Sequence, residues 1–128
     1  MSSVLLLLVE DEPMILHDVE DALTDGGYEV VTALSGSEAM ARLGERTDFA
    51  GLITDVRLGD GMNGWEVARQ VREANHGVAV IYITADSGSD WASQGVPGSL
   101  LVQKPFANAQ LVTAISTLLT EIQSSPHA

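Results

Sequence analysis

The chain has 128 residues, a length typical of one domain, and it contains no cysteine, which excludes disulfide bonds and thiolate metal sites. Its formal net charge of −12 comes from 18 acidic and six basic residues, so a nucleic-acid-binding surface, which needs clustered lysine and arginine, is not expected. The apolar run Leu5–Leu8 is too short for a membrane span and lacks the basic flank of a signal peptide, so we expect a cytoplasmic protein without membrane insertion.

The beginning of the chain predicts a buried strand followed by a helix. Val4–Val9 is continuously apolar, which is typical of a parallel strand that is covered on both faces. Pro13 suits the first turn of a helix, because proline has no backbone N–H to lose there. Gly26–Gly27 end the helical pattern.

A second strand and a short helix are predicted next. Tyr28–Ala33 is more polar than the first strand, and we therefore expect it at an edge of the sheet. Ser35 is a candidate N-cap of a helix that runs to about Leu43. Glu38, three residues after Ser35, is expected to complete a capping box.

The middle of the chain predicts a third strand, a loop and a helix. Phe49–Thr54 is strand-like, and the glycine-rich segment Val56–Gly64 after it is typical of a loop. Trp65 falls opposite the apolar face of the following helix and is therefore expected to be half exposed. That apolar face is formed by Val67, Ala68, Val71 and Ala74.

The last part of the chain predicts two strands, an irregular segment between them, and a helix. Val78–Ile83 and Leu100–Gln103 are the strands. Residues 86–99 are rich in Gly and Ser, so any helix there is short, and we expect this segment to be the most mobile part of the domain. Trp91 within it is expected to cover part of the core. Phe106–Gln123 has an apolar arc wide enough to cover a sheet.

Strands and helices therefore alternate five times, which predicts the α/β class. Such an order indicates a doubly wound parallel sheet with right-handed crossovers and helices on both faces. Neither a repeat nor a linker indicates a second domain, so we expect one domain over residues 1–123 and a frayed tail over 124–128. Ligands of such sheets bind beyond the carboxyl ends of the strands.

Polar side chains stand at the carboxyl ends of four of the predicted strands. Glu10 and Asp11 follow the first strand, Asp55 follows the third, and Thr84 ends the fourth. Lys104, the only lysine of the chain, follows the fifth. In a parallel sheet these groups converge at one edge, where they can hold a divalent cation and a phosphoryl group.

The three carboxylates also have structural explanations. Taken alone, Asp55 is more readily explained as a cap of the next loop than as a metal ligand or nucleophile, and Glu10 and Asp11 can complement a helix dipole. Together, however, they would repel one another without a cation. Mg²⁺, or Mn²⁺ in its place, resolves this repulsion, and the main-chain carbonyl of Arg57 can add a ligand.

Thr84 and Lys104 leave similar alternatives open. Thr84 either finishes a buried strand or bonds a phosphoryl oxygen, with the small Ala85 leaving room for the group. Lys104 is either an ordinary surface lysine or a compact positive charge for a phosphate. A cis peptide bond before Pro105 would aim the lysine inward.

With these residues, the chain resembles a response regulator receiver domain of two-component phosphorelay signalling over nearly its whole length. The motifs are V-E-D-E at 9–12, T-D at 54–55, I-T-A at 83–85 and K-P-F at 104–106. The resemblance implies a flavodoxin-like sheet with strand order 2-1-3-4-5. It also implies that the protein takes a phosphoryl group from the phosphohistidine of a histidine kinase or histidine phosphotransfer protein.

The resemblance further implies a role for each site residue. Asp55 is the phosphoacceptor, Lys104 pairs with the phosphoryl group, and Thr84 is the switch hydroxyl. The implied Mg²⁺ ligands are Glu10, Asp11, Asp55 and the carbonyl of Arg57. The output is expected to be contact with a downstream protein target by a monomer or weak dimer, without direct nucleic-acid binding.

Three features depart from the family pattern. Gly59 stands where many receivers have a proline, and the loop around it is one residue longer. Leu101 stands where an aromatic switch residue is often found, and Tyr82, on the same strand face as Thr84, is either its replacement or plain core. Residues 86–99 replace the usual fourth helix.

Two other functions compete with that of a phosphoacceptor, which is not a turnover enzyme. The first is a receiver-like scaffold that works without phosphate, and the intact acidic site and Lys104 argue against it. The second is a Mg²⁺-dependent aspartyl phosphatase. Such enzymes usually need a second aspartate two residues after the nucleophile, where this chain has Arg57.

Overall fold

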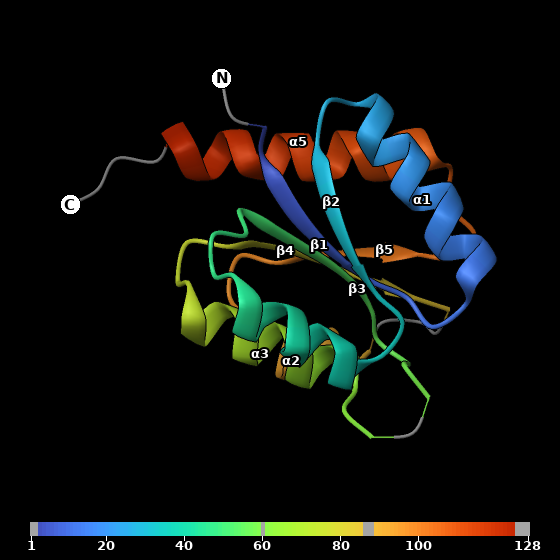
Figure 1. The fold of residues 1–128 in the computed structure, drawn as a ribbon, viewed down its shortest axis with the longest axis vertical. Coiled ribbons are helices and arrows are strands. Elements are labelled where there is room, and N and C mark those ends of the chain that lie inside the picture. The colour runs from blue at the N-terminus through green and yellow to red at the C-terminus, as the bar shows by residue number, and fades with distance from the viewer. Residues whose placement is uncertain (1–2, 60, 86–88, 125–128) are drawn as a thin grey trace.

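Five parallel strands form a single sheet in the order β2-β1-β3-β4-β5 (Figure 1). The computed structural model describes residues 3–59, 61–85 and 89–124. Both the predicted α/β class and the strand order are confirmed. The strands are β1 (Leu5–Val9), β2 (Glu29–Ala33), β3 (Gly51–Asp55), β4 (Ala79–Thr84) and β5 (Leu100–Gln103).

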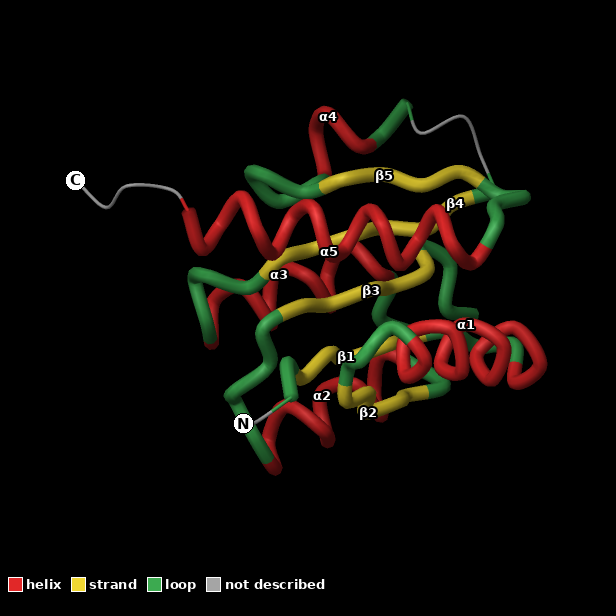
Figure 2. The backbone as a smooth tube through the Cα atoms, turned by 90° about the horizontal axis from the view of Figure 1, so that it is seen from above, coloured by secondary structure: helices red, strands yellow, loops and turns green. Residues whose placement is uncertain are grey.

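Helices cover both faces of the sheet (Figure 2). They are α1 (Pro13–Asp25), α2 (Gly36–Glu45), α3 (Gly64–Ala74), α4 (Trp91–Gln94) and α5 (Asn108–Ser124). Helices α1 and α5 lie together on one face, and α2 and α3 lie on the other. This arrangement explains why the central strands β1, β3 and β4 are buried at every position, because each of their faces packs against helices.

The sheet therefore separates two apolar cores. Leu6 and Leu8 of β1 pack in the core beneath α1 and α5, whereas Leu5 and Leu7 pack in the core beneath α2 and α3. All four of these leucines are buried. Strand β2, whose side chains are mostly half-buried or exposed, lies at the edge of the sheet as predicted.

Helix α1 begins and ends where the sequence predicts. Pro13 occupies its first turn, and Gly26 caps its end with backbone N–H bonds to carbonyls of the last turn. Gly27 follows with a φ of 98°, a left-handed conformation that favours glycine.

The cap of α2 is only partly as predicted. The Ser35 hydroxyl accepts a hydrogen bond from the N–H of Glu38 at 3.0 Å, so Ser35 is the N-cap. The carboxylate of Glu38, however, accepts from the N–H of Leu34 rather than from that of Ser35, so the reciprocal bond of a capping box is not formed there. A complete capping box, which we did not predict, joins Asn63 and Glu66 at the start of α3.

Two predictions about α3 are wrong. Trp65 is buried, with 8% of its surface exposed, and its ring lies 4.5 Å from that of Tyr82. Helical side chains lean toward the N-terminus, and Trp65 lies in the first turn, so its ring reaches past the helix end to the sheet. Ala74, expected on the apolar face, is exposed at the last residue of the helix.

Between β4 and β5, the residues that the structure describes form one short helix, as predicted. Helix α4 has four residues, and Trp91 at its start is half-buried against the core beneath α2 and α3, which confirms its predicted place. The hydroxyl of Tyr82 accepts a hydrogen bond from the buried N–H of Val96. Tyr82 is therefore a core residue, and its hydroxyl group anchors the segment that contains Val96 to the sheet. The high mobility of residues 86–99 stays a prediction, and residues 86–88 lie outside the described part of the chain.

The carboxyl-terminal helix differs slightly from its predicted bounds. Helix α5 starts at Asn108 rather than at Phe106 and includes Ser124, the first residue of the expected tail. Residues 125–128 of that tail lie outside the described residues. Among the helices that the structure describes, none is long and apolar enough to cross a lipid bilayer.

Candidate phosphoacceptor site

The carboxyl edge of the sheet brings together the polar residues that the sequence singled out. Asp55 is the last residue of β3 and pairs in register with Ile83 of β4, and Thr84 ends β4. Glu10 directly follows β1, and Lys104 directly follows β5. The common parallel direction of the strands therefore explains how residues 94 positions apart in the sequence come to one edge.

The three carboxylates lie close enough to share a cation. Glu10, Asp11 and Asp55 each have a carboxylate oxygen within 4.8 Å of the others. Glu10 and Asp55 are buried, whereas Asp11 is exposed to solvent. The group therefore has a buried inner part and an open outer side from which a ligand can approach.

Glu10 is the most perturbed member of the group. Burial raises the pKa of the Glu10 carboxyl to about 8, and the neighbouring carboxylate of Asp55 acts in the same direction. The positive charge of Lys104 opposes them only in part. The Oε2 atom of Glu10 is buried and has no hydrogen-bond partner among the residues that the structure describes.

Lys104 supplies the positive charge of the site. Its Nζ donates a hydrogen bond to Oδ2 of Asp55 at 2.8 Å and lies 4.0 Å from Oε2 of Glu10, too far for a hydrogen bond. Burial lowers the pKa of Lys104, but the hydrogen bond and charge of Asp55, with a contribution from Glu10, raise it above its usual value. The Lys104–Pro105 peptide bond is cis, as hypothesised.

The donor set fits a hard divalent cation. Mg²⁺ prefers oxygen ligands and is usually held by one or two carboxylates together with water and phosphate oxygens. Here three carboxylates converge, and the buried Oε2 of Glu10 needs either a proton or a positive partner. Glu10, Asp11 and Asp55 are therefore residues that can hold such an ion.

Thr84 and Arg57 are each joined to a residue of the site by a main-chain hydrogen bond. Thr84 is buried, and its main-chain carbonyl accepts a hydrogen bond from the N–H of Lys104 at 2.8 Å, which ties the ends of β4 and β5 together. Ala85 beside it is exposed. The N–H of Arg57 donates to Oδ1 of Asp55 at 3.3 Å.

Gly64 is a residue of the site that the sequence analysis missed. A Cβ atom at Gly64 would overlap the main-chain oxygen of Asp55, so only glycine lets α3 start this close to β3. The available signal was the N-G-W-E pattern at 63–66, in which a capping box leaves Gly64 as the first residue of the helix. Its contact with Asp55 depends on the folded chain and leaves no local pattern.

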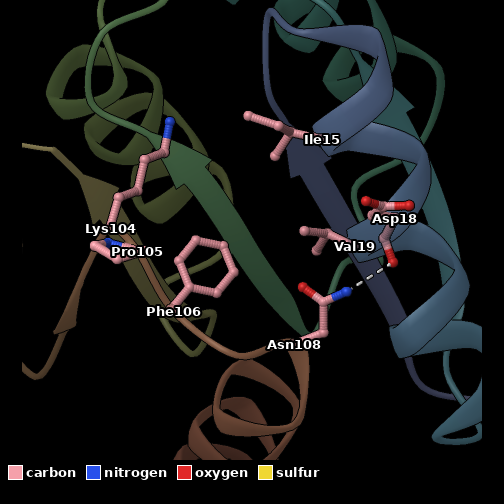
Figure 3. A pocket seen from close by; sticks show the side chains of 7 residues that line it. All are labelled: Ile15, Asp18, Val19, Lys104, Pro105, Phe106 and Asn108. Atoms are coloured by element: carbon pink, nitrogen blue, oxygen red, sulfur yellow. Dashed lines mark hydrogen bonds between the residues drawn. The ribbon is translucent and has the colours of Figure 1, made fainter.

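An apolar groove of about 490 Å³ lies beside Lys104, between α1 and the loop after β5 (Figure 3). The lysine side chain leaves this groove toward the end of β3 (Figure 3). The Asn108 amide donates to the main-chain oxygen of Asp18 at 3.4 Å across it. The groove is lined by Ile15, Asp18, Val19, Lys104, Pro105, Phe106 and Asn108.

Known proteins share both the sequence pattern and the fold. The sequence model of the family described as "Response regulator receiver domain" matches residues 6–116. A response regulator receiver protein from Sinorhizobium medicae WSM419 has a similar crystal structure, with a TM-score of 0.90 and 40% identity over 94% of this chain and 98% of that one.

Longer regulatory proteins also match. The transcriptional regulatory protein CusR of Escherichia coli (strain K12) is 33% identical over 116 residues, which are 89% of this chain and 50% of CusR. The response regulator SaeR of Staphylococcus aureus (strain USA300) is 27% identical over 95% of this chain and 53% of SaeR. The chain thus spans about half the length of these relatives. From its fold, its acidic strand-end site and the match over residues 6–116, the chain belongs to the response regulator receiver domain family and is a phosphoacceptor signalling module.

Proposed function

We propose that Asp55 accepts a phosphoryl group from the phosphohistidine of a histidine kinase or histidine phosphotransfer protein. The observation that carries this proposal is the position of the Asp55 carboxylate. One of its oxygens lies 2.8 Å from the ammonium of Lys104, and the carboxylates of Glu10 and Asp11 lie beside it. Asp55 thus has a positive partner for incoming phosphate and neighbours able to hold a cation.

The proposed transfer needs only the phosphohistidine and the Asp55 carboxylate as reactants. A carboxylate oxygen of Asp55 attacks the phosphorus, the P–N bond of phosphohistidine breaks, and its electron pair returns to the imidazole nitrogen. The product is an acyl phosphate on Asp55. Because phosphoryl transfer depends mainly on alignment and charge stabilisation, the main task of Lys104 is to hold Asp55 in place and to offset the negative charge of the phosphoryl oxygens.

Glu10, Asp11, Asp55 and the main-chain carbonyl of Arg57 are the proposed ligands of Mg²⁺. When bound, the ion supplies positive charge that offsets the carboxylates and the phosphoryl group. The high pKa of Glu10 supports this assignment, because the buried carboxyl stays protonated near neutral pH unless a positive partner compensates its charge.

Thr84 is the proposed reader of the phosphorylated state. Its place at the end of β4, with its carbonyl bonded to Lys104, lets one movement toward the phosphoryl oxygens involve both residues. Taking a two-state switch from mostly off to mostly on requires about 5.5 kcal/mol of differential binding. Two or three charge-assisted hydrogen bonds, at about 1.5–3 kcal/mol each, approach that value.

The output that we propose is a change in contacts with a downstream protein. The net charge of −12 disfavours direct contact of this chain with nucleic acid. The protein acts as an acceptor that gains and loses its own phosphoryl group, and it is not a turnover enzyme, because Arg57 stands where an aspartyl phosphatase needs its acid.

Phosphorylation of the purified chain by acetyl phosphate and Mg²⁺, followed by Phos-tag electrophoresis, tests this function. We expect the wild-type protein to shift in mobility and Asp55→Asn to stay unshifted. A wild-type protein that never shifts would favour the phosphate-independent scaffold. Sustained release of phosphate from small phosphate esters would instead indicate a phosphatase.

A further inference from the structure

The segment Val56–Asn63, called here the acceptor loop, joins β3 to α3 (Figure 1), and Asp60 within it lies outside the described residues. The N–H of Arg57 donates to Oδ1 of Asp55. At Gly59, a Cβ atom would lie 3.9 Å from Oδ2 of Asp11. The loop thus lies against two of the three carboxylates, so its position is part of the geometry of the site.

The two ends of the acceptor loop are held by the sheet and by α3. The N–H of Val56 donates to the carbonyl of Ile83 at 2.9 Å, and the N–H of Gly64 donates to the carbonyl of Val56 at 2.8 Å. Gly64 also packs directly on the main chain of Asp55. These contacts fix where the loop begins and ends.

Two glycines of the acceptor loop adopt left-handed backbone conformations. Gly59 and Gly61 have φ values of 77° and 92°, and glycine restricts the backbone less than any other residue. Two side chains anchor the loop. Leu58 is buried, and Met62 is half-buried against the core beneath α2 and α3.

Met62 meets the first residue of α2 at very close range. A Cβ atom at Gly36 would lie 2.7 Å from Cβ of Met62 and 2.8 Å from its carbonyl oxygen. Because one of these atoms belongs to the main chain, a rotation of the Met62 side chain would not relieve the overlap. Gly36 is itself fixed, since the Ser35 cap holds the start of α2 in place.

We propose that Gly36 is a positioning residue for the phosphoacceptor site. Its missing side chain lets Met62 rest against the start of α2, and this contact sets where Arg57 and Gly59 lie relative to Asp55 and Asp11. Gly36 precedes Asp55 by 19 positions and does not touch the reacting atoms. The inference rests on the proposed role of Asp55, and its test includes a measurement that needs neither metal nor phosphate.

Two glycine substitutions in the same helix separate this role from a general effect on α2. Gly36→Ala places a methyl group against Met62, whereas Gly44→Ala is the matched control, because a Cβ atom at Gly44 has nothing within 4 Å. The first measurement is the amide chemical shifts of Arg57 and Gly59 in the metal-free protein. The second is the initial rate of phosphorylation by acetyl phosphate with Mg²⁺, and thermal melting confirms that each variant is folded.

We expect Gly36→Ala to move both amide resonances and to slow phosphorylation at least tenfold, because a misplacement of about 1 Å at a reacting centre can cost about 10²-fold in rate. Gly44→Ala should change neither quantity. A folded Gly36→Ala protein with wild-type shifts and rate overturns the proposal, and so does an equal loss in both variants.

If Gly36→Ala does not fold, Met62→Gly decides the question. It leaves Gly36 in place but removes the whole methionine side chain, including the Cβ atom that lies against Gly36, so the same resonances should move and the rate should fall. Wild-type behaviour of Met62→Gly then overturns the proposal. If the wild-type protein takes up no phosphate, the proposed function fails, and the metal-free shifts alone decide whether Gly36 positions the loop.

Discussion

Asp55 lies between one positive and two negative neighbours. The ammonium group of Lys104 donates a hydrogen bond to the Asp55 carboxylate. Glu10 lies beside Asp55 in the buried part of the site, and Asp11 adds a third carboxylate on the solvent side. Each neighbour changes the charge balance of the same small volume, so substitutions among them should have separable effects on phosphorylation and on stability.

Removal of the Lys104 charge should mainly affect phosphorylation. Lys104→Gln leaves Asp55 without its hydrogen-bonded cation, and we expect a fall of about 10²-fold in the initial rate with acetyl phosphate and Mg²⁺, the usual loss for one stabilising donor. Lys104→Arg keeps the positive charge but in a planar guanidinium group, so its initial rate should lie between those of the wild type and Lys104→Gln. A wild-type rate in Lys104→Gln would contradict the role of this ammonium.

The raised pKa of Glu10 predicts a pH dependence of stability in the metal-free protein. The pKa is about 8 in the folded state and near the ordinary 4.5 when the chain is unfolded, so between these values the folded state binds more protons. Its stability should therefore fall as the pH rises through this window.

Urea unfolding in EDTA at about pH 6 and about pH 8 measures this slope. Glu10→Gln carries no titrating carboxyl and should lose the part of the slope that Glu10 contributes. If the slopes of wild type and Glu10→Gln are equal, the proton on Glu10 does not contribute to folding as stated.

At the scale of elements, the packing of α3 connects the site with the segment around α4. Gly64 touches the main chain of Asp55, and Trp65 packs its ring on Tyr82. The hydroxyl of Tyr82 in turn binds the N–H of Val96. Tyr82 is thus not a mobile surface ring but a buried support for the chain between β4 and β5.

Loss of the Tyr82 hydroxyl should loosen that chain. Tyr82→Phe leaves the buried N–H of Val96 without its acceptor, which we expect to lower the free energy of unfolding by about 1–3 kcal/mol. Amide hydrogen exchange should rise across residues 90–99. Tyr28→Phe is the matched control, because the Tyr28 hydroxyl bonds Ser116 at a half-buried place where water can substitute.

Two results would contradict this account of Tyr82. One is equal urea midpoints for wild type and Tyr82→Phe. The other is an exchange increase of the same size at residues 90–99 in Tyr28→Phe, since Tyr28 packs on the opposite side of the sheet with α5.

For the whole molecule, the sequence was sufficient to predict the fold class, because apolar strand-like runs alternate with helical patterns along the whole chain. It also predicted Glu10, Asp55 and Lys104 as neighbours, since a parallel sheet brings all its carboxyl ends to one edge. Trp65 was mispredicted because a helical wheel treats every turn alike, although side chains in the first turn can reach past the helix end. The contact of Gly36 with Met62 joins two elements and has no local pattern.

Magnesium should stabilise the whole domain. An ion that binds only the folded chain adds about 2.7 kcal/mol at a concentration of 100 times its dissociation constant. We therefore expect MgCl₂ to raise the melting temperature more than NaCl of equal ionic strength does.

A charge-matched pair of variants tests whether this effect comes from the site. Asp11→Asn removes a proposed ligand and should lose the difference between the two salts, whereas Asp25→Asn removes the same charge at the end of α1 and should keep it. If both variants respond to MgCl₂ as the wild type does, the stabilisation comes from general screening of the acidic chain.

The placement of Trp65 also gives the protein an intrinsic optical probe. Its indole belongs to the residue directly after Gly64, which lies against the main chain of Asp55, so we expect a phosphoryl group on Asp55 to change the electric field at the ring. The emission of an indole responds to such a change. With Trp91→Phe, Trp65 becomes the sole tryptophan, and stopped-flow fluorescence can then follow gain and loss of the phosphoryl group in real time without an added label.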